Sequence, residues 1–195
     1  MNYKVEILRR EEVFRKFFRI DEVTLRHQRF DGAMSPEMTR LVLNRGDSVA
    51  LLLADRARDA ILLCEQFRLP TYGPQSSGWI HELPAGVLEP NEDPQECARR
   101  EALEETGYSV SGMHRIATVY LSPGGSSERI HIFYAEIADG DRIQSGGGLA
   151  SEHEDIRMVW LPIADARRQC AEGAIADAKT LIAIQWLMLR SEAKS

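Results

Sequence analysis

One segment, Gly86 to Tyr108 (GVLEPNEDPQECARREALEETGY), constrains this chain more than any other part of its sequence. Asp93 followed by Pro94 is a strong signal for the start of a helix, and Gly107 is a strong signal for its end. At roughly 100° per residue, three glutamates of this helix fall within an arc of about 100°: Glu101, Glu104 and Glu105. Like charges at this spacing repel one another, so something should compensate for them.

The acidic face has two interpretations. The commoner meaning of an acidic run is a solvated helix surface. The alternative is a site for Mg²⁺ or Mn²⁺, which prefer oxygen ligands and bridge substrate phosphates. Arg100 can pair with Glu104 at i+4, but one arginine cannot neutralise three carboxylates. Gly86 precedes the helix in a loop where the backbone can approach a metal ion or phosphate closely, which favours the metal interpretation.

Around this helix, most of the chain has the apolar or alternating pattern of β-strands. Two further helices are expected at 163–173 and 177–190, ended by Gly173 and started by Asp177. Many strands with few helices predict an α+β domain built on a mixed sheet. The expected strands are Phe17–Phe30, Thr39–Gly46, Ser48–Ala54, Ala60–Phe67, Arg115–Leu121, Ile130–Ile137 and Ile156–Pro162.

The domain organisation is predicted to have two parts. Residues 1–45 resemble an added β-hairpin unit, with a turn at Asp31-Gly32. Residues 46–195 form the main domain. The pattern of residues leaves open whether the added unit packs on its own chain or on a partner.

Composition excludes several classes. The formal net charge is −6, so no basic surface for nucleic acid is expected. The three cysteines are widely spaced and give no disulfide framework, which favours a reducing compartment. No apolar run has the length of a signal peptide or a membrane span. A cytoplasmic protein with no membrane partner is therefore expected.

The glycine-rich segment 145–155 (SGGGLASEHED) differs from the rest of the chain. A run of three glycines gives a loop large backbone freedom. The segment is either a solvated surface loop or a lid that brings a carboxylate to a substrate. Composition alone favours the surface loop.

The acidic helix and its flanks resemble the Nudix box. Gly86, five residues, Glu92, seven residues, then the run REALEE from Arg100, one residue and Gly107 fill the positions of that motif. The one mild departure is Ala102, which stands where a larger aliphatic residue is usual. The resemblance implies the Nudix fold, a mixed-sheet α/β/α sandwich, here with an N-terminal antiparallel β-hairpin unit.

Other segments, including EQFRLP, SPGGSSER and GGLASEHEDIR, resemble the ADP-ribose pyrophosphatase branch of that family, and GDP-mannose pyrophosphatases share several of them. The resemblance implies Mg²⁺-dependent hydrolysis of the diphosphate bond of a nucleoside diphosphate sugar, with Mn²⁺ as a possible substitute. ADP-ribose, giving AMP and ribose 5-phosphate, is the first expectation and GDP-mannose the alternative. The non-enzymatic alternative is a sensor for ADP-ribose-type ligands.

The resemblance also implies roles for particular residues. The expected metal ligands are the Ala85 carbonyl and the carboxylates of Glu101, Glu104 and Glu105. Glu152 is the expected catalytic glutamate beside Glu101 and Glu105, with Glu154 as the runner-up. The expected substrate-binding residues are Arg40, Arg68, Gly86, Gly125 and Glu128. A homodimer that exchanges its N-terminal hairpins is implied as well, and the aromatic partner of the base is left open among Phe17, Phe18 and Phe30.

Overall fold

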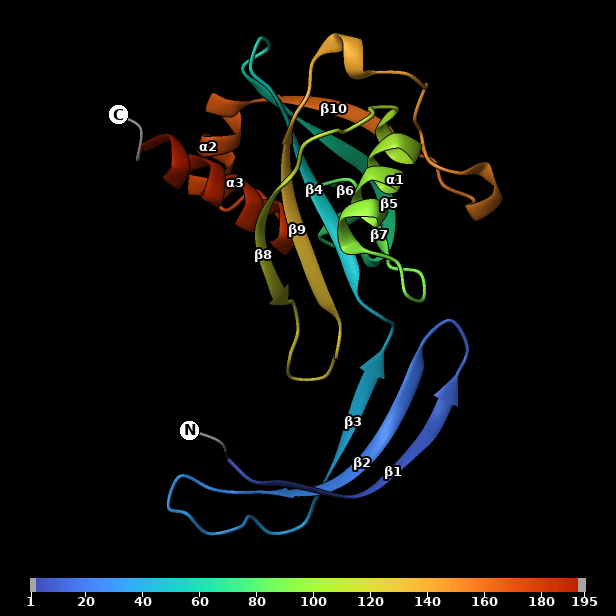
Figure 1. Cartoon of the computed structure of the whole chain (residues 1–195), viewed down its shortest axis with the longest axis vertical. Coiled ribbons are helices and arrows are strands. Elements are labelled where there is room, and N and C mark those ends of the chain that lie inside the picture. The colour runs from blue at the N-terminus through green and yellow to red at the C-terminus, as the bar shows by residue number, and fades with distance from the viewer. Residues whose placement is uncertain (1–2, 193–195) are drawn as a thin grey trace. The chain divides into compact units, whose positions relative to one another are not determined.

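The structure is a computed structural model that describes residues 3–192 (Figure 1). The chain forms two compact units. The first comprises the residues up to Gly46 together with Tyr120–Arg129, and the second comprises Asp47–Val119 and the residues from Ile130 onward. The segment Tyr120–Arg129 therefore belongs with the N-terminal residues, although it lies far from them in the sequence.

The first unit is a three-stranded antiparallel sheet in the order β1-β2-β3. Backbone hydrogen bonds join Tyr120–Arg129 to its third strand: the Leu43 N–H donates to the Gly125 carbonyl at 2.8 Å. The first strand was not predicted, because its run LRREEVFR does not alternate and nearly all of its residues are exposed. The strands are β1 Val5–Arg15, β2 Arg19–His27 and β3 Met38–Asn44.

The second unit is built on a seven-stranded mixed sheet. Its main order is β10-β5-β4-β9-β8, with β6 paired to β5 and β7 paired to β4. Strands β4 and β9 run parallel, whereas β4 is antiparallel to both β5 and β7. The strands are β4 Ser48–Asp55, β5 Ala60–Gly73, β6 Ser76–Glu82, β7 Ala85–Val87, β8 His114–Tyr120, β9 Arg129–Glu136 and β10 Arg157–Pro162.

Helices cover both faces of this sheet (Figure 1). Alternate residues of β4 point to opposite sides: Val49 and Leu51 join the core under α1, while Ala50 and Leu52 join the core under α3. All four are fully or almost fully buried. The predicted α/β/α sandwich on a mixed sheet is confirmed. The helices are α1 Pro94–Thr106, α2 Ile163–Ala171 and α3 Ala178–Glu192, with short 3₁₀ turns at Asp139–Asp141 and Ala150–Glu152.

The three predicted helices are present within one or two residues of their expected ends. Asp177 accepts hydrogen bonds from the Thr180 N–H and hydroxyl, as expected for the residue that starts α3. Strands β6 and β7 were not predicted, because β6 contains a glycine among polar residues and β7 is only three residues long. Among the described residues, no helix combines the length and the apolar character that a membrane span requires.

Candidate functional site

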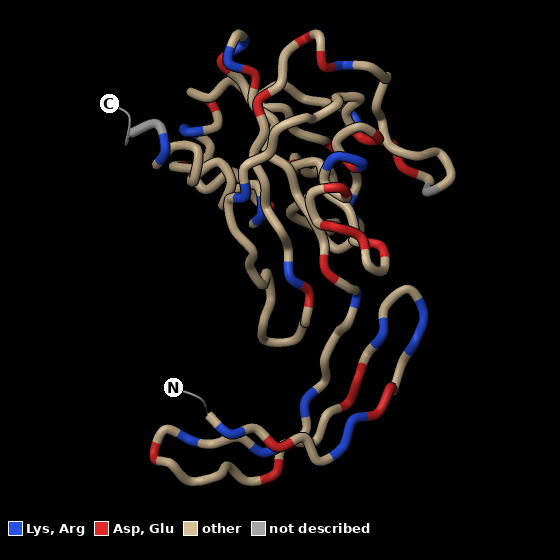
Figure 2. Tube along the Cα trace, in the orientation of Figure 1, with Lys and Arg blue, Asp and Glu red and all other residues tan. Residues whose placement is uncertain are grey.

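The ends of α1 fix the position of its acidic face. The Asp93 carboxylate accepts the Gln95 N–H at 2.8 Å, and Gly107 adopts φ 78° while its N–H donates to the Leu103 carbonyl. The sequence signals for both ends are therefore confirmed. Figure 2 shows acidic positions gathered along α1 and in the turn before it.

Glu105 is the most deeply placed carboxylate of the face, with only 1% of its surface exposed. Its Oε2 accepts the Ala85 N–H at 3.1 Å and the Cys64 thiol at 3.5 Å. Burial, followed by the charges of Glu101 and Glu154, raises the pKa of Glu105 to about 8. Cys64 is buried too, and burial raises the pKa of its thiol. The site thus holds a carboxylate that is costly to ionise without a compensating cation.

Glu101 lies against the backbone of β7 at Gly86. A Cβ at position 86 would lie 1.8 Å from the Glu101 Oε1, so only glycine leaves room for this carboxylate. Burial raises the pKa of Glu101 to about 7, although the adjacent Arg100 acts in the opposite direction. The sequence led us to expect a close approach of the Gly86 backbone to a metal ion or phosphate. In the structure this backbone lies against the Glu101 carboxylate, and the approach to a metal ion or phosphate stays a prediction.

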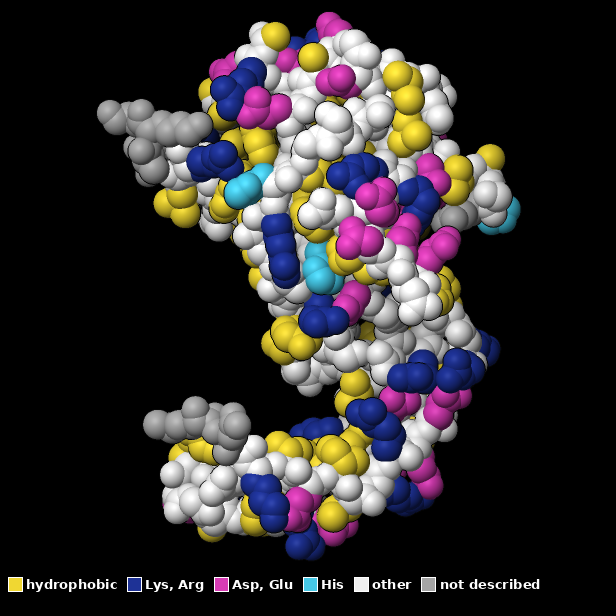
Figure 3. Space-filling model, in the orientation of Figure 1, with side chains coloured by type: hydrophobic (Ala, Val, Ile, Leu, Met, Phe, Trp, Pro, Cys, Tyr) yellow, Lys and Arg dark blue, Asp and Glu magenta, His cyan; other side chains and the backbone are white. Residues whose placement is uncertain are grey.

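Arg100 links the carboxylates of the helix to the loop before it. Its Nε and Nη2 donate to the two oxygens of Glu92 at 3.1 and 3.3 Å, and its Nη1 donates to Glu101 at 2.8 Å and Glu104 at 3.2 Å. The bond from Arg100 lowers the pKa of Glu92 to about 2. Figure 3 shows acidic and basic side chains side by side on this face. Arg100 therefore holds the carboxylates of Glu92, Glu101 and Glu104 together, and the pairing with Glu104 expected from the sequence is present.

The glycine-rich run is docked onto the end of α1. The Gly147 N–H donates to the Glu105 carbonyl at 2.8 Å and the Gly148 N–H to the Glu104 carbonyl at 3.2 Å. All three glycines have positive φ, and a Cβ at Gly146 would lie 2.5 Å from the carbonyl carbon of Thr106. The glycines thus satisfy the last carbonyls of the helix. Composition favoured a solvated surface loop, whereas Gly147 and Gly148 are anchored to the end of α1. The alternative, a lid that brings a carboxylate to a substrate, stays a prediction.

The segment that follows brings a carboxylate toward the acidic face. Glu154 is half-buried and accepts the Leu149 N–H at 2.9 Å. Its charge contributes to the raised pKa values of both Glu101 and Glu105. Glu152 ends the 3₁₀ turn Ala150–Glu152, and its side chain lies outside the described part of the structure. The structure therefore brings Glu154, the runner-up, to the cluster and does not test Glu152.

Arg68 and two buried residues that the sequence did not single out form a charged network beside this cluster. The Arg68 Nε donates to the Glu82 Oε1 at 2.7 Å, and the Lys179 ammonium donates to the Glu82 Oε2 at 2.5 Å. Glu82 and Lys179 are buried, whereas 41% of the Arg68 side chain is exposed. A lone lysine on the first turn of the apolar α3 was the only sequence signal for this network.

The other expected substrate residues belong to the first unit. Arg40 lies on β3 and donates from its Nη1 to the Thr39 carbonyl. Gly125 accepts the Leu43 N–H, and Glu128 lies 3.7 Å from the Arg45 Nε. The cluster described above, which is confined to the second unit, contains none of the three.

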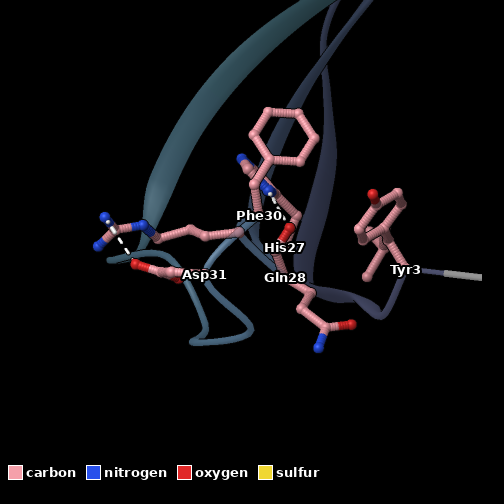
Figure 4. A pocket seen from close by; sticks show the side chains of 7 residues that line it. Tyr3, His27, Gln28, Phe30 and Asp31 are labelled. Carbon is pink, nitrogen blue, oxygen red and sulfur yellow. Dashed lines mark hydrogen bonds and ion pairs between the residues drawn. The ribbon is translucent and has the colours of Figure 1, made fainter.

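The first unit contains a cavity of about 600 Å³ at the end of its sheet. Figure 4 shows Tyr3 and Phe30 on its wall, with ring centroids 5.9 Å apart. Arg29 is paired with Asp31 at 3.0 Å. The cavity is mainly apolar and holds no acid cluster, so it is unlike the carboxylate site of the second unit.

The donor set of the acidic face fits a hard divalent cation. The carboxylates of Glu101, Glu104 and Glu105 offer only oxygen, which Mg²⁺ and Mn²⁺ prefer, and two of them are buried enough to resist ionisation. Among residues 3–192, no group of three or more acidic, histidine or cysteine side chains has the arrangement needed to hold a metal ion. The oxygens of Glu101 and Glu104 accept hydrogen bonds from Arg100, and those of Glu105 accept the Ala85 N–H. A bound cation would compete with Arg100 for the first two carboxylates.

Residues 44–183 match the family model of the NUDIX domain. The chain is 39% identical over 189 residues to an ADP-ribose pyrophosphatase of Escherichia coli (strain K12), covering 97% of this chain and 90% of that protein. It is 36% identical over 191 residues to a GDP-mannose pyrophosphatase of Pectobacterium atrosepticum, covering 97% of each. A crystal structure of an ADP compounds hydrolase superposes with a TM-score of 0.73 over 98% of this chain and 96% of that one, at 20% identity, which supports the fold alone.

Proposed function

The chain belongs to the NUDIX domain family, and from that premise we propose that it hydrolyses the diphosphate bond of nucleoside diphosphate sugars. ADP-ribose, cleaved to AMP and ribose 5-phosphate, is the proposed substrate. The observation that carries the proposal is the acidic face of α1, where half-buried Glu101 lies against Gly86 and buried Glu105 lies against Ala85. This arrangement suits the binding of a dication-complexed diphosphate.

Two groups of residues would bind the two charged parts of the complex: the carboxylates would bind the metal ion, and Arg68 would bind the phosphate oxygens. Glu101, Glu104 and Glu105 with the Ala85 carbonyl would hold Mg²⁺, which when bound neutralises diphosphate charge and lowers the pKa of a bound water. Arg68 presents a guanidinium to the anionic side of the substrate, a geometry that favours phosphate oxygens. A glutamate of the segment after the glycines would accept the proton of the attacking water.

A substrate panel tests this function. We expect AMP release from ADP-ribose with Mg²⁺ present, and no release after chelation. The value of kcat/KM is measured side by side for ADP-ribose, ADP-glucose and GDP-mannose, because the relatives named for both activities have similar identity to this chain. A kcat/KM higher for GDP-mannose than for ADP-ribose would make GDP-mannose the assigned substrate. Binding without turnover of any of them would instead support a ligand sensor.

The identity of the general base gives a separate prediction. We propose Glu152 for this role, and expect Glu152→Gln to lower kcat by about 10²-fold or more, in the range of lost acid–base catalysis. Glu154 holds the Leu149 N–H, and Glu154→Gln keeps an oxygen that can accept that bond, so a loss of under about 10-fold is expected for it. The measurement is the pH profile of kcat for both variants. A larger loss in Glu154→Gln would assign the base to Glu154.

We also propose a homodimer in which the N-terminal unit serves the partner. In support, nearly every residue of β1 is exposed, including apolar Val5, Ile7, Val13 and Phe14, and exposed apolar patches of this kind mark interaction surfaces. Light scattering is expected to give twice the monomer mass, with specific activity falling on dilution. A fully active monomer at all concentrations would rule this proposal out.

A further inference from the structure

The Arg68 side chain is held in an unusual way. Arginine and carboxylate commonly pair through two parallel hydrogen bonds. Here a single bond, from the Arg68 Nε to the Glu82 Oε1, holds the guanidinium. Within the described part of the chain, neither Nη nitrogen of Arg68 donates a hydrogen bond to another residue. Both Nη groups are therefore available to a ligand.

Lys179 binds the oxygen of Glu82 that Arg68 does not contact. The Lys179 ammonium donates to the Glu82 Oε2 at 2.5 Å and also donates to the Asp177 Oδ1 at 3.0 Å. Asp177 is in turn fixed by two hydrogen bonds from Thr180, whose hydroxyl also accepts the Leu83 N–H. Glu82 and Lys179 have side chains that are 3% and 9% exposed, so water cannot readily replace either partner.

We propose that Lys179 is a positioning residue for Arg68: its ammonium binds the Glu82 Oε2 and its positive charge opposes approach of the Arg68 guanidinium to that oxygen. Arg68 therefore binds Glu82 through its Nε–H alone, and its two Nη groups face the oxygens of an anionic substrate. Without the lysine, the Glu82 Oε2 has no cation beside it, and the guanidinium turns to bind both oxygens of Glu82 side-on. The Nη groups of Arg68 then donate to Glu82 instead of to the substrate. The inference rests on the proposed function for the identity of the anion, which is the diphosphate of a nucleotide sugar.

The test uses Lys179→Met in the full chain. Calorimetry with a methylene-bridged ADP-ribose analogue, which cannot be cleaved, is expected to show Kd raised about 10-fold, a range typical of one lost charged contact. KM rises in parallel while kcat stays within about 3-fold, because the carboxylates of α1 are untouched. Lys179→Arg, which keeps the charge and the donors, is the matched control and should hold Kd within about 3-fold of the wild type.

A second background separates positioning from general structural support. In Arg68→Ala protein, Lys179→Met should weaken analogue binding no further, since the arginine through which it acts is gone. Equal weakening in both backgrounds, or an unchanged Kd in the single variant, overturns the inference. If Lys179→Met does not fold, Lys179→Gln decides, because it removes the charge, keeps a polar side chain and is one bond too short to replace the Lys179 ammonium on Glu82. The same rise in Kd, absent in the Arg68→Ala background, is expected, and its absence overturns the inference.

The wild type distinguishes this inference from the proposed function. A wild type that neither binds nor cleaves any nucleotide sugar overturns the proposed function, and the inference with it. A wild type that binds and cleaves, with Lys179→Met indistinguishable from it, overturns the inference alone.

Discussion

Replacing Glu105 with glutamine is expected to lower kcat for ADP-ribose by about 10³-fold and to leave the fold intact, because it removes a charge that we propose binds the metal ion but keeps the shape of the side chain. The glutamine oxygen can still accept the Ala85 N–H that the Glu105 Oε2 accepts at 3.1 Å. Steady-state kinetics with Mg²⁺ check the result. Glu96→Gln is the matched control, since Glu96 lies on the same helix with 67% of its side chain exposed and, among the described residues, its carboxylate pairs with Arg99 alone. A loss below about 10-fold in Glu105→Gln would remove Glu105 from the machinery.

The same variant is expected to stabilise the protein when no metal is present. The pKa of Glu105 is raised to about 8 in the folded state from an ordinary value of 4.5. The folded state therefore binds more protons than the unfolded state between these values, and stability falls as pH rises through 8. Glutamine cannot ionise, so with chelator at pH 9 its Tm should exceed that of the wild type by roughly 5 °C, and the gain should vanish near pH 5. A lower Tm at pH 9 would contradict the burial of this charge.

The predictable parts of the fold were those with strong local signals. The helix bounded by Asp93 and Gly107 needs no tertiary context, because capping and left-handed glycine are local effects. Strand β1 carries few local signals, since its residues are exposed and charged and its pairing with β2 is decided by tertiary contacts. The assignment of Tyr120–Arg129 to the first unit was likewise hidden, because backbone bonds to β3 leave no trace in side-chain pattern.

The sequence predicted the charged face of α1, but it did not predict the buried ion pair beside that face. Three like charges on one helix face are visible in any sequence, and so is a glycine before them. The pairing of Glu82 with Lys179 joins residues 97 apart in the chain, and no periodicity reports such a contact. The glycine run shows the opposite error: three glycines signal freedom, yet the Gly147 and Gly148 N–H groups close the end of α1. The glycine content indicates which backbone conformations the segment can adopt, whereas its hydrogen bonds to α1 determine which conformation it has.

Gly86→Ala is expected to lower kcat by about 10²-fold without changing any charged residue, since a misplacement of about 1 Å in catalytic geometry has an effect of this size. The added Cβ would stand 1.8 Å from the Glu101 Oε1, so the carboxylate must move. Gly86 has no positive φ, so alanine fits its backbone and Tm should change little. Gly112→Ala is the control, because a Cβ there meets nothing within 4 Å.

A compensating change makes the cause of this loss testable. Aspartate at position 101 is shorter by one methylene and withdraws the carboxylate from the alanine, so Glu101→Asp should cost less in the Gly86→Ala protein than in the wild type. The coupling between the two positions is measured as the ratio of the kcat losses in a double-mutant cycle, with a ratio of about 5 or more expected. Additive losses would mean that alanine acts elsewhere than on Glu101. Coupled losses would identify the contact between the β7 backbone and the helix carboxylate as the feature that sets the geometry of the site.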